Sequence, residues 1–260
     1  MVERNNTTAI KLAWEFFKGN YALNFAAIAI LIVLNLLGAI PVIGMLFIFA
    51  YSILSLSIQI YFARSVEQIQ RVEEIAQVAS ETKIGDFFTR YLQVAAGAFL
   101  GLFLIALVFM FIFGIMVSVS GGVDAMMQAM GERGAAMQMH MSYSMVSFGL
   151  SGLVLLLVAG VLFYFFPAMM GRVMREEDFV GAFKGVFTLF SPTLWKSTFN
   201  KAYFTLILLW SLVMVGVVVI AFVLAASIIL LPLLLVLAYI VSLYNAAIYI
   251  FAADLAKEDR

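Results

Sequence analysis

The residues best suited to chemistry lie together in segment 126–145, which holds seven of the fifteen methionines and the single histidine of the chain. Met137, Met139, His140 and Met141 place three thioethers and one imidazole within five positions. Thioether sulfur is a soft ligand suited to Cu(I), and imidazole also binds copper. The pattern therefore predicts a candidate site for Cu(I) or Ag(I). Methionine is also a flexible gap-filler, so the same residues fit packing or contact with a partner.

A serine motif is the second candidate. Gly149-Leu150-Ser151-Gly152 matches the Gly-x-Ser-Gly motif of rhomboid-like intramembrane proteases. An activated serine needs a base within hydrogen-bond reach. That family takes its histidine from a later span, whereas His140 precedes the motif and no later histidine exists. We therefore expect these small residues to allow close helix contact rather than to form a catalytic site.

Other chemical motifs are missing from the sequence. The chain has no cysteine, which excludes a thiolate metal site and a cysteine nucleophile. It also has no Walker-type phosphate loop and no His-Glu-x-x-His zinc motif. The formal net charge is +0, which gives no reason to propose a nucleic acid partner. These observations predict a protein that is not an enzyme and that needs no cofactor.

Composition identifies the elements that must position these residues. The chain is 65% hydrophobic and 12% charged, whereas a soluble domain is about 45–50% apolar and about 25% charged. Its charges fall in narrow bands between long uncharged runs, and a membrane-spanning helix needs about 20 apolar residues. We expect an all-α polytopic membrane protein forming one membrane domain, 1–260, with spans near 21–38, 43–63, 92–117, 146–170, 203–226 and 231–252.

The spans are expected to pair as three helical hairpins. Gly38 and Pro41 interrupt the first long apolar run where a tight turn is needed, and Pro232 does the same in the last run. Fourteen of the fifteen lysines and arginines lie on one side of this arrangement, leaving Arg133 on the other. The positive-inside rule then predicts that both termini are cytoplasmic. The methionine-rich loop 119–145 is expected to be extracytoplasmic, and periplasmic in a cell with two membranes.

Amphipathic segments precede the hairpins on the cytoplasmic side. Val66, Ile69, Val72, Ala76 and Ala79 recur at helical spacing, which predicts one helix lying along the membrane surface. Aromatic stretches "EFFKGNY", "DFFTRYL" and "DFVGAFKGVFTLF" introduce spans one, three and five, and the first and last hairpins end in "IYFARSVE" and "IYIFAADL". We interpret these as three tandem repeats of an interfacial helix plus a hairpin, 8–64, 84–172 and 178–254.

The layout and three longer motifs resemble a broad group of functionally uncharacterised six-helix bacterial inner-membrane proteins. The motifs are "AWEFFKGNY" near the start, "FYFFPAMMGRVMREEDFVGAFKGVFTLFSP" at the end of the fourth span, and "LPLLLVLAYIVSLYNAAIYIF" near the end. The resemblance implies a six-helix fold in the bacterial inner membrane. It implies no reaction and no catalytic residues.

Polar residues within the predicted spans are few. None of the six spans contains an ionisable residue, which argues against a proton-driven pump. The amides Asn24, Asn35, Gln59, Gln93 and Asn245 could line a solute path, although hydrogen bonding between helices is the commoner use. Gly97 and Gly101 form a Gly-x-x-x-Gly pair, which predicts a packing face for another helix.

Charged residues outside the spans suit helix ends. The acidic run Glu176-Glu177-Asp178 follows Arg172 and Arg175 and is expected to open the next interfacial helix, because negative residues stabilise a helix amino terminus.

Three functional hypotheses follow from the sequence. The first is an accessory, assembly or scaffold subunit that contacts the lipid bilayer and binds other membrane proteins or a second copy of itself. The second is a Cu(I) or Ag(I) binding or transport protein that captures the metal in its outer loop. In that case the metal path through the spans would continue along Met110, Met116, Met169 and Met170. The third is a facilitator for an uncharged solute that passes along Asn24, Asn35 and Asn245.

Overall fold

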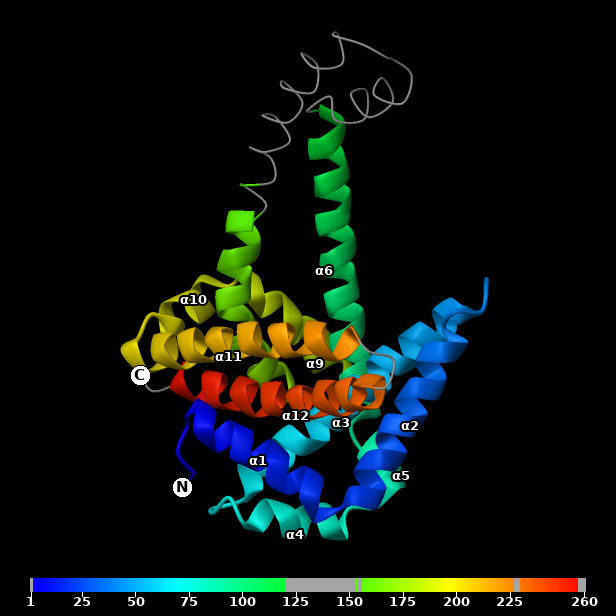
Figure 1. Ribbon diagram of the computed structural model, residues 1–260. Coiled ribbons are helices and arrows are strands. Elements are labelled where there is room, and N and C mark those ends of the chain that lie inside the picture. The colour runs from blue at the N-terminus through cyan, green and yellow to red at the C-terminus, as the bar shows by residue number, and fades with distance from the viewer. Residues whose placement is uncertain (1, 120–152, 154–155, 227–229, 257–260) are drawn as a thin grey trace. The chain divides into compact units, whose positions relative to one another are not determined.

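The computed structural model describes residues 2–119, 153, 156–226 and 230–256, and every regular element in these ranges is helical. The chain divides into two compact units, residues 1–101 with 165–260, and residues 102–164. The helices are α1 (Asn6–Gly19), α2 (Tyr21–Leu37), α3 (Gly44–Gln68), α4 (Glu74–Glu81), α5 (Ile84–Thr89), α6 (Leu92–Val119), an unlabelled helix (Leu156–Val173), α9 (Phe179–Val186), the 3-10 helix η1 (Phe187–Phe190), α10 (Pro192–Thr198), α11 (Lys201–Ala225) and α12 (Leu231–Leu255) (Figure 1).

Five of the described helices are long and apolar enough to cross a membrane. They are α3, the stretch Ile84–Ile115, which covers α5 and most of α6, the helix Leu156–Val173, α11 and α12. A sixth candidate is the pair α1 and α2, which are long and apolar enough only together and are bent by 97° at Asn20. The predicted spans thus fall on apolar helices, except that residues 146–152 of the fourth span lie outside the described residues. Helices of this composition indicate an integral membrane protein.

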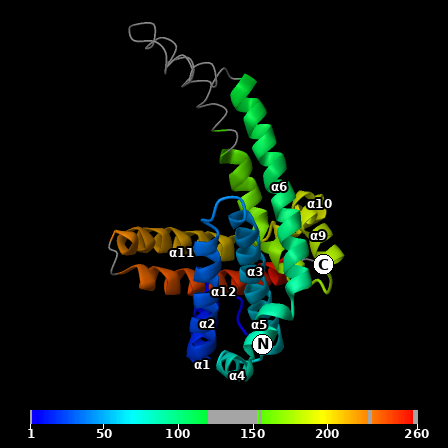
Figure 2. The same ribbon diagram turned by 90° about the vertical axis from the view of Figure 1, so that its right-hand side faces the viewer.

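The core of the larger unit is built around the carboxyl-terminal half of α12. Residues 246–253 are buried without interruption, whereas Leu231, Leu233 and Leu235 near the start of the helix are exposed. Helix α12 contacts α1, α3 and α11, and it runs beside α11 in both ribbon views (Figures 1 and 2). Helix α12 is therefore a central element of this unit, packed against α1, α3 and α11.

Aromatic rings from three separate stretches of sequence meet beside α1. The ring centroid of Phe16 in α1 lies 5.1 Å from that of Phe62 in α3 and 5.8 Å from that of Phe87 in α5. Tyr61 packs edge-on against Phe87 at 5.3 Å. Phe16, Phe62 and Phe87 are all fully buried, and each aromatic pair contributes about 0.5–1.5 kcal/mol beyond the apolar area that it buries. The aromatic stretches that precede the first and third predicted spans thus pack together.

Glycines set the distance between several helices. A Cβ added to Gly97 in α6 would lie 2.2 Å from the carbonyl oxygen of Phe179 in α9, and one added to Gly101 would lie 3.0 Å from that of Phe183. The predicted packing face of the Gly-x-x-x-Gly pair is confirmed, and α9 is the helix that occupies it. Gly171 plays the same part against α12, because its added Cβ would lie 1.9 Å from the carbonyl oxygen of Tyr249.

The surface helix predicted across Val66, Ile69, Val72, Ala76 and Ala79 is wrong as a single element. Helix α3 continues to Gln68, the chain leaves the helical conformation, and α4 begins at Glu74. The break has a local cause, because the Glu74 carboxylate accepts the backbone N–H of Gln70 at 2.8 Å and of Arg71 at 3.3 Å. Ile75 and Ala79 are the buried residues of α4.

The predicted turn between the first two spans lies at residues 38–43. Helix α2 ends at Leu37 and α3 begins at Gly44. Val42 in this turn has a φ of 70°, a conformation that is uncommon and strained for a β-branched residue.

The smaller unit, residues 102–164, contains the later part of α6 and the start of the helix Leu156–Val173. Its described side chains are mostly apolar and largely exposed, with Phe111 at 70% and Leu156 at 69%.

Candidate functional site

Charged side chains gather where the ends of three long helices of the larger unit meet. Glu67 comes from the end of α3, Arg175 follows the helix Leu156–Val173, and Asp254 lies near the end of α12. Arg4 from the amino-terminal segment and Arg64 from α3 complete the group. We call these five residues the charge cluster. Each apolar helix ends at a charged band, so the packing of the helix ends brings the charges together.

Arg175 links two acidic partners at the centre of the charge cluster. Its Nη2 donates to Asp254 Oδ1 at 2.5 Å, and its Nε donates to Glu67 Oε1. Asp254 also pairs through Oδ2 with the Nε of Arg4 at 3.2 Å. The side chains of Arg175, Asp254 and Glu67 are only 18%, 22% and 25% exposed. Because the three helix ends share these ion pairs, removing one partner would leave charge poorly compensated in a partly buried place.

The environment of Arg175 acts on its pKa in two opposing ways. Burial by itself lowers the pKa of the guanidinium, and the hydrogen bonds and charges of Glu67 and Asp254 outweigh burial, so the pKa is raised. Arg175 therefore stays charged at every physiological pH. Arg175 is consequently a permanent cation at the centre of the charge cluster.

Arg64 extends the charge cluster to the segment before α9, and Arg172 makes a contact with α10. Arg64 Nη2 donates to the carbonyl oxygen of Glu176 at 2.9 Å, and its guanidinium lies 5.9 Å from the ring centroid of Tyr91. Arg172 Nη2 donates to the hydroxyl of Ser197 in α10 at 3.1 Å. The arginines thus hold loops and helix ends in position.

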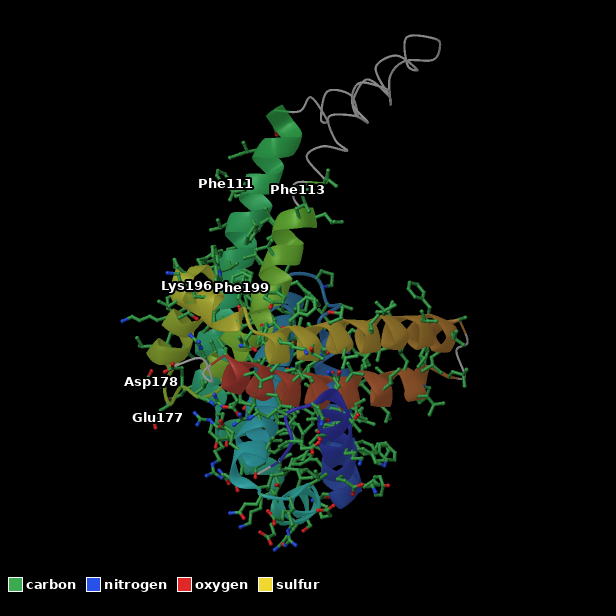
Figure 3. All side chains as sticks on the ribbon, turned by 90° about the vertical axis from the view of Figure 1, so that its left-hand side faces the viewer. Phe111, Phe113, Glu177, Asp178, Lys196 and Phe199 are labelled. Atoms are coloured by element: carbon green, nitrogen blue, oxygen red, sulfur yellow. The ribbon has the colours of Figure 1, made fainter. Side chains whose placement is uncertain are left out.

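The acidic run before α9 begins the helix as expected. Asp178 is the N-cap of α9, and its Oδ1 accepts the backbone N–H of Gly181 at 2.6 Å. Glu177 and Asp178 lie at the outer edge of this part of the chain (Figure 3). A capping carboxylate satisfies a backbone donor that the helix leaves open, which confirms the prediction that this run begins a helix.

Two of the amides predicted within the spans hydrogen-bond between helices. Asn24 in α2 is fully buried, and its Nδ2 donates to the carbonyl oxygens of Phe16, Phe17 and Asn20 at 3.3, 3.1 and 2.8 Å. Its Oδ1 accepts the hydroxyl of Tyr239 in α12 at 2.6 Å. Asn24 thereby ties the end of α1 and the bend after it to α12.

Asn245 in α12 uses its side chain in a similar way. Its Oδ1 accepts the indole N–H of Trp210 in α11 at 2.9 Å. Asn35 is different, because it is exposed and lines a groove of about 100 Å³ with Tyr51, Ser55 and Ser242, between α2, α3 and α12. Asn24, Asn35 and Asn245 therefore do not line one common path.

The candidate metal ligands Met137, Met139, His140 and Met141 lie outside the described residues, as do the serine motif 149–152 and most of loop 119–145. Among the methionines proposed as a continuation of the metal path, Met169 and Met170 are 0% and 2% exposed within the packed larger unit. Met110 is 59% exposed in the smaller unit. Within the described ranges, no three His, Cys, Asp or Glu side chains are grouped closely enough to hold a metal ion.

The charge cluster was missed from the sequence, although a signal for it exists. Arg64 follows Ile60-Tyr61 and Asp254 follows Ile248-Tyr249, so similar apolar helix ends lead into single residues of opposite charge. On that basis, charged residues directly beside long uncharged runs could have been predicted to form ion pairs with one another. Which acid meets which base still depends on how the helix ends pack.

No protein family, no curated protein and no solved structure is significantly similar to this chain. The resemblance to six-helix inner-membrane proteins therefore rests on the sequence motifs alone.

Proposed function

We propose that this chain is a non-enzymatic, multi-pass integral membrane protein that acts as an accessory, assembly or scaffold subunit of a membrane complex. In this role it binds other membrane proteins or a second copy of itself through the outward faces of its apolar helices. The surrounding bilayer covers the remainder of those faces.

One observation carries the proposal. Several buried or partly buried polar groups of the larger unit make their contacts within the chain, as in the Asn24–Tyr239 and Trp210–Asn245 hydrogen bonds and in the charge cluster. The outward side chains of α11, by contrast, are apolar and exposed, with Leu212 at 60%, Val215 at 63% and Phe222 at 75%. A surface of this kind suits lipid and other apolar helices rather than water.

A finer topology belongs to the same proposal. The six apolar helices form three hairpins that insert in the same direction into a bacterial inner membrane. Both termini and the short helices α1, α4, α5, α9 and α10 lie on the cytoplasmic side, where most of the lysines and arginines are found. This orientation places the charge cluster at the cytoplasmic ends of the hairpins, where charged groups are tolerated.

Site-directed photo-crosslinking in native membranes tests the proposal. A photoreactive amino acid replaces Phe222, which is 75% exposed on α11, and in a matched control it replaces Leu243, which is 0% exposed in α12. The proposal expects a discrete protein adduct from position 222 and none from position 243. Alkaline extraction of the same membranes reports whether the chain is integral.

Two results separate the parts of the proposal. Release of the chain into the alkaline supernatant would contradict membrane integration itself. Retention in the membrane with only lipid adducts at Phe222, and at further exposed positions such as Val215, would contradict the accessory role and leave the membrane class intact.

A further inference from the structure

A groove of about 440 Å³ lies beside the charge cluster in the larger unit. The amino-terminal segment contributes Arg4 and Asn6 to its wall, the first turns of α11 contribute Lys201 and Thr205, and Leu209 lies farther along the same helix. Leu255 from the end of α12 also lines it. The groove therefore opens at the charged ends of the apolar helices, next to the start of the exposed face of α11.

The two cationic side chains that line this groove are Lys201 and Arg4, and of the described residues that line it none is acidic. Asp254 beside the groove offsets the charge of Arg4, so among these residues Lys201 supplies the uncompensated positive charge. The ion pair between the Nε of Arg4 and Asp254, at 3.2 Å, fixes the direction of the guanidinium. An exposed ammonium and an oriented guanidinium on one groove favour a phosphate or another compact anion.

The amide side chains beside the groove are already used in hydrogen bonds within the chain. A bound anion would therefore contact the cationic side chains of Lys201 and Arg4. Asn6 donates to the carbonyl oxygen of Leu206 at 3.0 Å and accepts the hydroxyl of Tyr244. Asn5 accepts the backbone N–H of Thr8 at 2.8 Å, and Asn200 accepts that of Tyr203 at 2.8 Å, so both helix starts are already capped. Electrostatic attraction in the groove thus comes mainly from Lys201, with the guanidinium of Arg4, held by Asp254, as a second donor.

The apolar side chains of the groove favour a lipid over a free anion as its ligand. Leu209 is 45% exposed at the groove, and Leu212 continues the apolar surface at 60% exposure one turn farther along α11. A free phosphate would leave these leucines without a contact. A phospholipid with its headgroup beside Lys201 would lay its acyl chains along them.

We propose that this groove binds the phosphate headgroup of an anionic glycerophospholipid, with Lys201 and Arg4 as its cationic contacts and the leucines of α11 beside its acyl chains. Basic pockets at the cytoplasmic ends of membrane helices recognise anionic headgroups in this manner. The inference rests on the proposed membrane insertion, because only a chain in the bilayer presents Leu209 and Leu212 to lipid.

Lipid binding by the full chain in mixed detergent micelles tests the site. The probe is radiolabelled phosphatidylglycerol, competed by unlabelled phosphatidylglycerol, by phosphatidylcholine or by inorganic phosphate. Phosphatidylglycerol is expected to displace the probe, and the other two are expected not to. Lys201→Gln should weaken binding about fivefold, because one basic residue near a membrane surface contributes about 1 kcal/mol.

Two further variants keep the test independent of folding. Lys201→Arg retains the charge and should restore binding. Lys196→Gln removes another exposed lysine, on α10, that does not line the groove, and should leave binding unchanged (Figure 3). Equal losses in Lys196→Gln and Lys201→Gln would mean general surface attraction and would overturn the site.

The remaining outcomes are equally decisive. Displacement of the probe by phosphatidylcholine, or full binding in Lys201→Gln, would overturn the inference while a chain that resists alkaline extraction still supports the proposed function. Displacement by millimolar inorganic phosphate would identify a free-anion site and overturn the lipid assignment. Release of the chain by alkaline extraction would instead mean that the proposed function has failed.

Discussion

Gly171→Ala probes the closest helix contact in the larger unit. The added Cβ would lie 1.9 Å from the carbonyl oxygen of Tyr249 and 2.7 Å from the Cβ of Ala253, whereas ordinary contact begins at 3.4 Å. Helix α12 would therefore have to retreat by about 1.5 Å, a difference set by the same two distances. Overpacking of this kind costs about 1–3 kcal/mol, and the obstacle here is backbone, which cannot rotate away. We expect a loss of about 2–3 kcal/mol.

Thermal unfolding of the purified protein in mild detergent measures this cost. With about 2–4 °C per kcal/mol for a chain of this size, Gly171→Ala should lower Tm by about 5–10 °C. Gly216→Ala is the matched control, because Gly216 lies in α11 and nothing lies within 4 Å of its added Cβ. This control should leave stability unchanged or raise it by up to about 1 kcal/mol through helix propensity.

Comparison of the two glycine variants can refute the reasoning. If Gly171→Ala and Gly216→Ala unfold at the same temperature as the natural chain, then the helix Leu156–Val173 does not approach α12 closely enough for a methyl group to collide with Tyr249. If both lower Tm equally, the effect of Gly171→Ala is a general response to a methyl group and not a collision with Tyr249.

Three further predictions address the hydrogen bonds and ion pairs. Asn24→Leu should destabilise the protein by about 1–3 kcal/mol, because the buried hydroxyl of Tyr239 loses its acceptor, and adding Tyr239→Phe should recover part of that loss in denaturant titrations. Arg175→Met should cost about 1–2 kcal/mol, between the values for exposed and buried pairs, whereas Arg71→Met, whose side chain is 79% exposed, should change little. The backbone N–H of Gln70, followed by the side chain of Arg71, holds the pKa of Glu74 below its ordinary value of 4.5. The start of α4 is therefore stabilised fully above about pH 4.5 and loses this support as the pH falls through the lower folded pKa, which hydrogen exchange of α4 should report and Glu74→Gln should abolish.

Each of these predictions has an opposing result. A double variant no more stable than Asn24→Leu alone would mean that Tyr239 does not depend on Asn24. Equal losses in Arg175→Met and Arg71→Met would mean that the charge cluster contributes no more than a surface pair. Exchange in α4 that shows the same pH profile in Glu74→Gln would rule out the carboxylate as the cause.

Elements with local signals could be predicted from the sequence. The uncharged runs predicted apolar helices where they are found, and Gly38 with Pro41 predicted the turn after α2, because hydropathy and backbone restriction act over a few residues. The break between α3 and α4 was missed, since the apolar spacing from Val66 to Ala79 continues through it. At this break the side chain of Glu74 accepts the backbone N–H groups of Gln70 and Arg71. The spacing of apolar residues does not report such a hydrogen bond.

The sequence by itself determined the membrane class, the positions of the apolar helices and the charged bands between them, because these depend on the composition of contiguous segments. The tertiary structure alone decided that Arg175 meets Glu67 and Asp254, that Asn24 serves Tyr239 while Asn35 faces a groove, and that Gly171 tolerates no side chain where Gly216 has room. These outcomes depend on which helix faces come together across more than a hundred residues of chain, as from Glu67 to Arg175. Similar apolar helices can pack in many ways, so their composition does not specify the partner.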